Sequence, residues 1–515
     1  MVQPVKAVVL VGGGTAGWLT AGLIAARHQA RMKAGGFSVT LIESPDIRII
    51  GVGEGTWPTI RSSLERMGVS ETALFRHCDA AFKQGGKFAG WTTGAADDAY
   101  YHPLMLPQGF AQLNLVPHWV REAPNQSFCD FVTSQGRLCD EGLAPKLITS
   151  PEYRALANYS YHLDAGKFAP FLARHCAEKL GVRHVPADVV QVNQTESGDI
   201  ASVLTRQAGE IQGDLFIDCS GFSALLIGKT LGVGFKGCGD VLFCDTALAA
   251  QVPYETPDAP LASQTNATAQ EAGWIWDIGL PTRRGVGYVY SSRHSSEEAA
   301  RESLLRYIGP QHREVPVRKI PIRSGHRQIF WKNNCVAVGL AGGFLEPLES
   351  SAIVLVELSA KLIAEQMPAN REVMDIVAKR FNDVTLYRWG RIIDFLKLHY
   401  VLTRRTDSAF WRDNVAAESV PERLKELLKL WKYHPPWFFD EFDRLEEVFP
   451  AASYQYVLYG MGFQSETSPE DTIDTELLAS RLRQENERQT VDLRSRLPKN
   501  RELLNKIREY GLQPV

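Results

Sequence analysis

The 515-residue sequence has no long apolar run and no long block of charge of one sign. No stretch reaches about 18 uninterrupted apolar residues, the length that a membrane-spanning helix needs. The apolar run near the N-terminus is too short for a signal peptide and passes directly into glycines. We therefore expect a cytoplasmic protein that does not bind membranes.

Charge and cysteine usage exclude further classes of protein. The 56 basic and 59 acidic residues leave a formal net charge of -3, with no basic run that would bind nucleic acid. The eight cysteines form no CxxC pair and have no regular spacing, which argues against a disulfide framework and against a metal site. We therefore expect reduced cysteines, no bound metal, no nucleic-acid partner and a small-molecule substrate.

The N-terminal region predicts a strand, a glycine turn, a helix and a second strand. KAVVLVGGGTAGWLTAGLIAARH contains Gly12, Gly14 and Gly17 in the spacing GxGxxG, and FSVTLIES places Glu43 at the end of the second strand. Such glycines let the backbone approach a pyrophosphate at a helix N-terminus, and the carboxylate can hold a ribose hydroxyl. This α/β pattern predicts a dinucleotide-binding module. The alternative is a glycine turn that only packs a helix onto a sheet.

The rest of the chain predicts a second sheet and a helical C-terminal part. We expect a helix over YHLDAGKFAPFLARHCAEKLGVRHV, and the end of a helix running into a strand over AAFKQGGKFAGW, residues 80–91. TALAAQV, GWIWDIGL and GVGYVYSS predict an inserted antiparallel sheet between about 240 and 330. A strand, a glycine turn and a long helix follow over residues 334–367, and helices dominate from about 370. We therefore predict a module of residues 1–390 that contains the inserted sheet, and a mostly helical module of residues 391–515.

Several motifs together resemble the flavin-dependent halogenases of the tryptophan halogenase family. The matching segments are GGGTAGW, GVGEGTWP, FKQGGKFAGW, DLFIDCSGF, GWIWDIGLP with GYVYSS, VGLAGGFLEPLESSA, LHYVLTRRTDSAFW and YQYVLYGMGF. The WxWxIP motif separates these halogenases from flavin monooxygenases of the same fold. It is represented by Trp274, Trp276 and Ile278, with Gly279 in place of the proline.

The resemblance implies an FAD-binding fold of the glutathione-reductase and aromatic-hydroxylase type, with a helical module that covers the substrate. It implies FAD, used as FADH2, rather than NAD. Because no second nucleotide module is visible in the chain, a separate flavin reductase is expected to supply the FADH2. The implied FAD contacts are Gly12, Gly14, Thr15, Ala16, Gly17, Glu43, Gly51, Gly53, Glu54, Gly339 and Leu340.

The resemblance also assigns a role to Lys83. Halide and an electron-rich aromatic ring do not react until the halide has been oxidised, and reduced flavin with oxygen supplies that oxidising power. By resemblance, Lys83 captures the resulting hypohalous acid, either through a hydrogen bond from its ammonium or as a haloamine. The alternative is a surface lysine, which is the role we assign to Lys87.

Four residues that follow one another are implied to complete the active site. Glu349 matches the carboxylate that accepts the proton of the halogenated ring, and the alternative is an acid in the first turn of a helix. Ser350 is the expected hydrogen-bond partner of the lysine. The backbone amides of Ser351 and Ala352 are expected to hold chloride or bromide. The family more often has Thr and Gly at the last two positions, so the preferred halide stays open.

The remaining implied residues face the flavin or the substrate. Trp274, Trp276 and Ile278 are expected to wall the flavin off from the substrate, and plain core packing is the alternative. His102 is a candidate substrate contact, and a structural histidine is the alternative. No clamp for the charged end of an amino acid is visible, which favours indole or a similar small aromatic substrate. Two other functions stay open at this point, a flavin-dependent aromatic monooxygenase and a non-catalytic flavoprotein.

Overall fold

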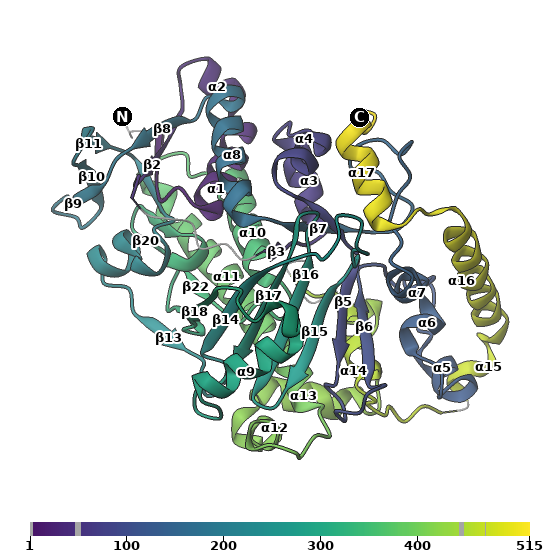
Figure 1. Ribbon diagram of the computed structural model, residues 1–515. Coiled ribbons are helices and arrows are strands. Elements are labelled where there is room, and N and C mark those ends of the chain that lie inside the picture. Colours follow the sequence, from purple (N-terminus) through teal and green to yellow (C-terminus); the bar gives the residue numbers. More distant parts are fainter. Residues whose placement is uncertain (1–3, 47–52, 442–446, 469, 515) are drawn as a thin grey trace. The chain divides into compact units, whose positions relative to one another are not determined.

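The computed structural model describes residues 4–46, 53–441, 447–468 and 470–514 (Figure 1). The chain forms two compact units, each built from three separate segments. Unit 1 consists of Met1–Asp79, Leu163–Cys238 and Arg323–Trp389. Unit 2 consists of Ala80–His162, Gly239–Ile322 and Gly390–Val515. The last change of unit lies at the boundary predicted near residue 390, whereas residues 239–322 group with unit 2. The two predicted modules stay a prediction.

Unit 1 is built on a six-stranded sheet. Its strands, in spatial order, are β20 (Trp331–Lys332), β21 (Cys335–Ala337), β12 (Leu215–Asp218), β1 (Ala7–Val11), β2 (Ser38–Glu43) and β8 (Arg183–Pro186). All neighbours are parallel except β20, which pairs antiparallel with β21 at the edge. A parallel sheet is covered on both faces, so its strands are apolar throughout. This explains why β1 is the continuous run AVVLV.

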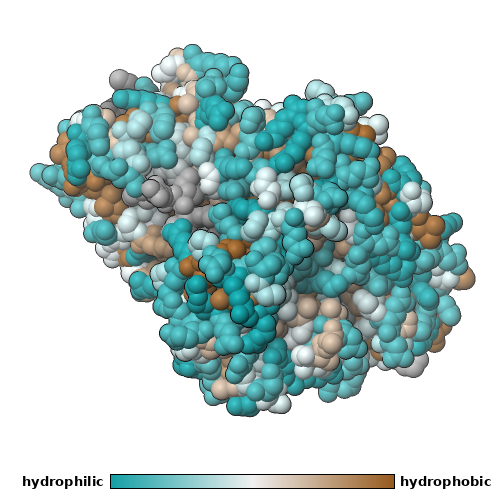
Figure 2. Space-filling model, viewed as in Figure 1, coloured by the Kyte–Doolittle hydropathy of each residue, from teal (hydrophilic) through white to brown (hydrophobic). Residues whose placement is uncertain are grey.

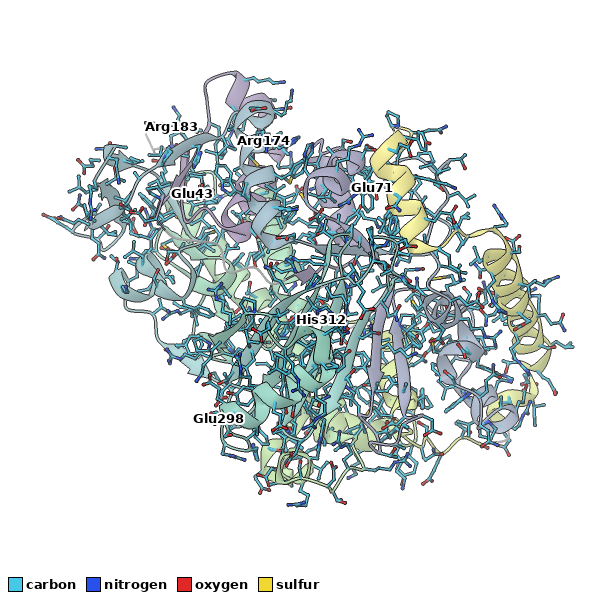
Figure 3. All side chains as sticks on the ribbon, viewed as in Figure 1. Glu43, Glu71, Arg174, Arg183, Glu298 and His312 are labelled. Carbon is cyan, nitrogen blue, oxygen red and sulfur yellow. The ribbon has the colours of Figure 1, made fainter. Side chains whose placement is uncertain are left out.

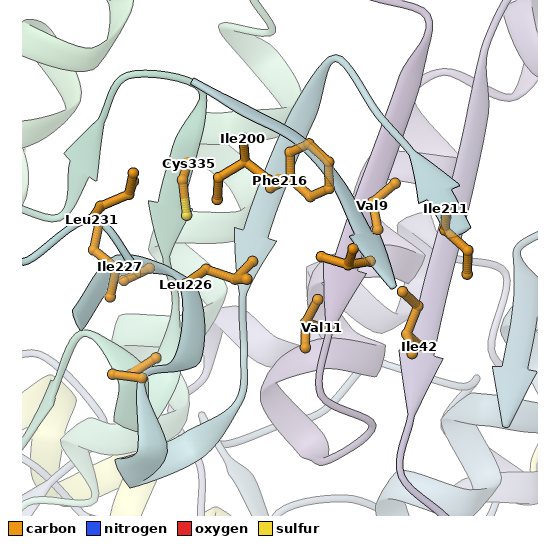
Figure 4. Packing of buried hydrophobic residues seen from close by; sticks show 14 of the residues in the cluster. Val9, Val11, Ile42, Ile200, Ile211, Phe216, Leu226, Ile227, Leu231 and Cys335 are labelled. Carbon is orange, nitrogen blue, oxygen red and sulfur yellow. The ribbon is translucent and has the colours of Figure 1, made fainter. Parts of the chain in front are cut away.

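Helices and a small sheet cover the two faces of this sheet. α1 (Thr15–Arg27) contacts β1 and β2 and lies beside α8 (Ala165–Leu180) and α10 (Ser351–Glu365), as Figure 1 shows. The opposite face packs against β11 (Gly209–Gln212), β10 (Ile200–Thr205) and β9 (Val189–Gln194). In Figure 4, Val9 and Val11 lie in the same cluster as Ile200 and Ile211. Each such buried aliphatic side chain contributes about 1.5–3 kcal/mol.

The remaining elements of unit 1 are short, apart from the first part of α11. They are α2 (Gln29–Lys33), β3 (Glu54–Gly55), α3 (Thr59–Arg66), α4 (Glu71–His77), η1 (Gly221–Ser223), η2 (Leu225–Thr230), β13 (Phe235–Gly237), β19 (Gly325–Arg327), η4 (Gly339–Ala341), β22 (Gly343–Phe344) and α11 (Arg371–Val401). The strands β13, β19 and β22 form a three-stranded antiparallel sheet. α11 begins in unit 1 and ends in unit 2.

Unit 2 contains a seven-stranded sheet. Its order is β18 (Val317–Pro321), β14 (Thr246–Pro253), β17 (Arg283–Tyr290), β16 (Gly273–Gly279), β15 (Thr265–Gln270), β5 (Gly85–Ala89) and β6 (Ala99–Pro103). Only β15 and β5 are parallel. The predicted antiparallel strands are therefore confirmed as β14, β16 and β17. Helix α9 (Glu297–Ile308) packs Leu304 and Ile308 against Ile275 and Val286 on one face of this sheet.

Two predictions about local structure were wrong. Residues 80–91 contain two strands, β4 (Ala81–Lys83) and β5, because Gly85 has a φ of +155° and lets β5 approach the backbone of His102 closely. The helix expected from residue 161 begins only at Ala165, where the Asp164 side chain accepts a hydrogen bond from the Gly166 amide. Residues before it form β7 (Ser160–Leu163), and Gly181, with a φ of +75°, ends the helix before β8.

Of the other helices of unit 2, those before residue 313 lie outside the predicted helical C-terminal part, and those after residue 408 lie within it. They are α5 (Val116–Glu122), α6 (Phe128–Val132), α7 (Gln135–Asp140), η3 (Pro310–His312), α12 (Ala409–Val415), η5 (Ala417–Ser419), α13 (Glu422–Trp431), η6 (Phe438–Glu441), α14 (Ala451–Gly460), α15 (Glu470–Ile473), α16 (Glu476–Arg496) and α17 (Asn500–Tyr510). Among the described residues, no helix has the length and apolar character to cross a bilayer. The face drawn in Figure 2 is mostly hydrophilic.

Candidate functional site

The glycine turn of unit 1 connects β1 to α1. Gly12 has a φ of +119°, and a Cβ at this position would lie 2.1 Å from the carbonyl oxygen of Cys219. A Cβ on Gly17 would lie 1.9 Å from the carbonyl oxygen of Gly12. Both positions therefore require glycine. Gly12 needs it because of its backbone conformation, and Gly17 needs it because α1 packs tightly onto the turn.

Gly14 has a different environment from its two neighbours in the motif. It precedes α1 in an extended conformation, and a Cβ there would meet nothing within 4 Å. No side chain caps the helix and its first turn has no acidic residue, so the amides that begin with Thr15 can bind an anion. Gly339 lies beside this turn, because its Cβ would be 2.6 Å from the Cβ of Ala16. Leu340 follows Gly339 in η4.

Glu43 ends β2 beside the glycine turn (Figure 3). Its Oε2 lies 2.9 Å from His184 Nε2, and a Cβ on Gly13 would lie 2.1 Å from the Glu43 carboxyl carbon. The end of β2, the glycine turn and the start of α1 thus lie together, as the GxGxxG pattern predicts.

The GVGEGTWP segment is described only in part. Gly51 lies outside the described residues. Gly53 has a φ of +110°, a conformation that favours glycine. Burial, and then the negative charge of Asp164, raise the pKa of Glu54 to about 7. Glu54 can therefore take up a proton near neutral pH.

The segment from Glu349 to Ala352 lies at the start of α10. Glu349 is 6% exposed, and its carbonyl oxygen accepts a hydrogen bond of 2.8 Å from Trp57 Nε1. It lies outside the helix, which begins at Ser351, so the alternative of a first-turn acid does not describe its position. Ser350 has a φ of +55° and its side chain does not cap α10. The amides of Ser351 and Ala352 form the first turn of α10.

Lys83 ends β4 in unit 2 and is 5% exposed. The next residue, Gln84, is fully buried, and its Nε2 donates hydrogen bonds to the carbonyl oxygen of Leu143 at 2.7 Å and to Ser263 Oγ at 3.1 Å. The strand end that carries Lys83 is therefore held firmly. A surface lysine, the alternative, does not fit this degree of burial.

The strand opposite Lys83 carries a residue that the sequence did not single out. β4 and β7 are antiparallel, with Lys83 opposite Ser160 and Ala81 opposite His162. Burial, and then the positive charge of Lys83, lower the pKa of His162 well below its ordinary value. The sequence signal that could have moved His162 out of the predicted helix is Asp164, a residue type that favours the helix N-cap and so places the residues before it outside the helix.

Trp274, Trp276 and Ile278 lie on one face of β16, as their spacing predicts. The rings of the two tryptophans are 6.4 Å apart between centroids, with an angle of 61° between their planes. The Trp276 ring lies across Gly287, its cross-strand partner, because a Cβ there would come within 2.2 Å of the ring. All three side chains are buried, so they form a continuous apolar wall within unit 2.

His102 lies in β6 and is buried. Its Nε2 is 2.9 Å from Ser453 Oγ, and its ring lies among those of Phe395, Phe449 and Tyr456. This environment suits a structural histidine, and the role of substrate contact stays a prediction.

The eight cysteines are all buried with free thiols. Within the part of the chain that the structure describes, no group of three or more His, Cys, Asp or Glu side chains could hold a metal ion. Unit 1 thus brings together the glycine turn, Glu43 and Gly339. Unit 2 brings together Lys83 with Ser160 and His162.

Comparisons with known proteins identify the family. The profile of the family described as tryptophan halogenase matches residues 7–474. The tryptophan 6-halogenase SttH of Streptomyces toxytricini is 34% identical over 476 residues, which cover 88% of this chain and 89% of SttH. The crystal structure of a tryptophan halogenase from Shewanella frigidimarina NCIMB 400 is 46% identical, with a TM-score of 0.96 and 100% and 99% of the two chains covered.

A further solved structure, BrvH, a flavin-dependent halogenase from Brevundimonas sp. BAL3, is 34% identical. It has a TM-score of 0.86 and covers 98% of this chain, with 99% of its own chain matched. The mixed α/β fold is therefore the fold of flavin-dependent halogenases. Because the family profile and these relatives span most of the sequence, this chain belongs to the tryptophan halogenase family of flavin-dependent halogenases.

Proposed function

We propose that this chain uses FADH2, oxygen and chloride or bromide to halogenate an electron-rich aromatic compound of the indole type. The observation that carries the proposal is the burial of Lys83 at the end of β4, in a chain of the halogenase family. A lysine removed from bulk water can hold hypohalous acid without competition from solvent. This separates the proposal from the alternative of a non-catalytic flavoprotein.

The glycine turn of unit 1 fits FAD. The space at Gly14, the amides that begin with Thr15 and the Glu43 carboxylate would hold the pyrophosphate and a ribose hydroxyl. Ala16, Gly339 and Leu340 would border the same cofactor. When bound, reduced FAD together with oxygen supplies the oxidising power that converts halide to hypohalous acid. The open position of Gly14 supports this fit, because a turn that only packs a helix needs no free space there.

The start of α10 supports a halide site. The amides of Ser351 and Ala352 belong to the first turn of a 15-residue helix without a side-chain cap. Such amides carry partial positive charge and can hold an anion without a charged side chain. The left-handed conformation of Ser350 turns the chain sharply before these donors. Chloride and bromide are both candidates, because backbone donors discriminate little between them.

Lys83 and Glu349 would each act in one step of the transfer of the halogen to the substrate. Lys83 holds and polarises hypohalous acid, and the ring attacks its halogen. The oxygen–halogen bond breaks, and its oxygen leaves as hydroxide, which becomes water when it takes up a proton. The halogenated ring is then a cation that must lose a proton, and the Glu349 carboxylate stabilises that charge and accepts the proton. Both side chains are buried, and low dielectric strengthens their electrostatic effects.

The wall of Trp274, Trp276 and Ile278 supports halogenation over direct hydroxylation. By the family resemblance, such a wall would keep the organic substrate away from the cofactor. A monooxygenase needs the opposite arrangement, in which the aromatic ring reaches the cofactor directly. The replacement of a proline by Gly279 leaves the three wall residues in place within β16.

The substrate proposal is indole or a similar small aromatic compound. SttH is a tryptophan 6-halogenase and the Shewanella relative is a tryptophan halogenase, so free tryptophan is the competing substrate. His102, with its aromatic neighbours Phe395 and Phe449, would contribute an apolar contact for a flat ring. We propose that a separate flavin reductase supplies FADH2. Of the two GxGxxG spacings in the sequence, residues 12–17 lead into a helix as a dinucleotide site requires, whereas residues 232–237 end in the strand β13.

The experiment combines the purified protein with FAD, a flavin reductase, NADH and bromide or chloride. Indole and tryptophan are supplied in separate reactions, and products are identified by mass. Halogenated indole formed faster than halogenated tryptophan supports the proposal in full. Halogenated tryptophan alone would retain the reaction and replace the substrate. Hydroxylated product, equal with and without halide, would favour the monooxygenase.

The cofactor site has its own test in a pair of glycine variants. Gly14→Ala introduces a methyl group into empty space, so the protein should fold with unchanged thermal stability but bind FAD more weakly. Gly12→Ala introduces a clash with Cys219 and should destabilise the fold itself. Unchanged FAD affinity in Gly14→Ala, measured by fluorescence titration, would argue against a pyrophosphate at this turn.

A further inference from the structure

His162 shares one face of a strand pair with Lys83. In the antiparallel pair of β4 and β7, Ala81 is opposite His162 and Lys83 is opposite Ser160. Directly opposite residues point to the same face, and so do residues two apart on one strand. His162 is therefore a diagonal neighbour of Lys83. The position directly opposite His162 holds only the methyl group of Ala81.

The two nitrogens of His162 have different surroundings. The side chain is fully buried, and Nε2 lies 2.8 Å from Thr265 Oγ1. Nδ1 is also buried and has no hydrogen-bond partner among the described residues. Most buried polar atoms are paired, so such an atom needs a physical explanation. Lys83 lies diagonally across the strand pair from His162, and its positive charge acts on the imidazole.

The charge of the imidazole follows from its surroundings. Burial and the nearby charge of Lys83 lower the pKa of His162, so the imidazole is neutral near pH 7. A neutral imidazole has one donor nitrogen and one acceptor nitrogen. When Nε2 donates to Thr265, Nδ1 carries the free lone pair. This lone pair is the acceptor that an ammonium needs.

We propose that His162 is a positioning residue, whose Nδ1 accepts a hydrogen bond from one water molecule that in turn accepts a hydrogen bond from the ammonium of Lys83. The inference rests on the role of Lys83 in the proposed function and deepens it. A buried neutral imidazole accepts this hydrogen bond without taking the proton. Lys83 therefore stays protonated. This favours the role in which its ammonium donates a hydrogen bond to hypohalous acid over the role in which its neutral amine forms a haloamine.

Two conservative variants separate the two nitrogens. His162→Gln places its amide near Nε2, so it keeps a partner for Thr265 and loses the acceptor at Nδ1. His162→Asn places its amide near Nδ1, so it keeps an acceptor beside Lys83 and loses the contact with Thr265. Thr265→Val is the control, because it removes only the hydroxyl that bonds Nε2 and keeps a side chain of similar shape.

The full-length variants are assayed with FAD, a flavin reductase, NADH, bromide and indole. One readout is the rate of bromoindole formation, and the other is the rate at which a dye traps hypobromous acid. We expect His162→Gln to lower bromoindole formation by about tenfold or more, since a hydrogen bond to a charged group is lost. His162→Asn should lose clearly less, and the dye signal should match the wild type in both variants.

Three results would overturn the inference. His162→Gln could form bromoindole at the wild-type rate. The two His162 variants could instead lose the same activity together with the same thermal stability, which is the pattern of a purely structural residue. Loss of the dye signal in parallel with bromoindole would place His162 in the formation of hypobromous acid rather than in its transfer. A wild type that forms no halogenated product would overturn the proposed function itself, which is a distinct result.

Discussion

Two lysines that are four residues apart, Lys83 and Lys87, have opposite environments. Lys83 ends β4 and is 5% exposed, beside Ser160 and His162 of β7. Lys87 lies in β5, its side chain is 32% exposed, and its Nζ pairs with Asp140 at 2.7 Å. The residue type and the sequence neighbourhood are almost the same. The difference shows that strand pairing, rather than local sequence, decides which lysine can do chemistry.

The physical basis of this difference lies in what covers each strand. β4 pairs along its edge with β7, whose residues from Ser160 to Leu163 are all buried. Lys87 lies between Asn266 of β15 and Tyr101 of β6, and its Nζ lies 5.2 Å from the Tyr101 ring. A charge near the surface finds an acidic partner and solvent. A buried charge has neither solvent nor freedom to move, and so acts on what binds beside it.

The largest effect is expected from removing Lys83. Lys83→Ala should lower halogenated product by roughly 100-fold or more, in the range typical of a positioned group that transfers or activates a reactant. Hypohalous acid trapped by a dye should persist, because this step precedes Lys83. Lys87→Ala is the matched control, with activity within about twofold of wild type. Equal losses in the two variants would end the contrast between the two lysines.

Glu349 extends the comparison to a buried acid. Glu349→Gln keeps the shape and removes the charge, so halogenation should fall by roughly 10- to 100-fold, with a smaller effect on KM for the substrate than on kcat. The reason is that the carboxylate acts on the cationic ring, which exists only after the ring is attacked. Steady-state kinetics with indole measure the effects of the variant on kcat and on KM separately. An increase in KM alone would make Glu349 a binding residue.

Stability at low pH reports on the surroundings of Lys83. Because the pKa of His162 is lowered in the folded state, the unfolded chain binds a proton that the folded chain does not, once the pH falls below about 6.5. The native state should lose up to about 1.4 kcal/mol per further pH unit from this group. Denaturant midpoints of wild type and His162→Gln at neutral and acidic pH test this. The same acid loss in both proteins would mean that other groups cause it.

The smallest effect concerns the ion pair of Lys87. Lys87 and Asp140 are partly exposed, so Lys87→Ala should change the free energy of unfolding by only about 0.5 kcal/mol. The same denaturant titration, repeated at high salt, should show the difference shrinking further. A loss of several kcal/mol would mean that Lys87 is as deeply embedded as Lys83, which would remove the basis of the comparison.

Parts of the site with short-range patterns could be predicted from the sequence. The GxGxxG spacing predicted the turn between β1 and α1, and Gly12 and Gly17 have the close backbone contacts that exclude a side chain. Alternation predicted that Trp274 and Trp276 share a face of β16. These predictions succeed because a tight turn and a pleated strand depend on neighbours within a few residues.

Other parts could not be predicted because they depend on pairing between distant segments. Residues 80–91 were expected to run from the end of a helix into a strand. They contain the two strands β4 and β5 instead, which pair with β7, β15 and β6 from three other parts of the sequence. His162 was assigned to a helix, and its place beside Lys83 follows only from the β4 and β7 register. Local propensity carries little information on such register.

By itself, the sequence determined the class of fold, the glycine turn that suits a dinucleotide, and the family to which the chain belongs. These depend on glycines, apolar runs and motifs, whose physical requirements are local. Only the tertiary structure decided that Lys83 is buried while Lys87 is partly exposed, that Glu349 lies outside α10, and that His162 lies diagonally across from Lys83. Burial and charge depend on which distant strands meet, and that is a property of the folded chain as a whole.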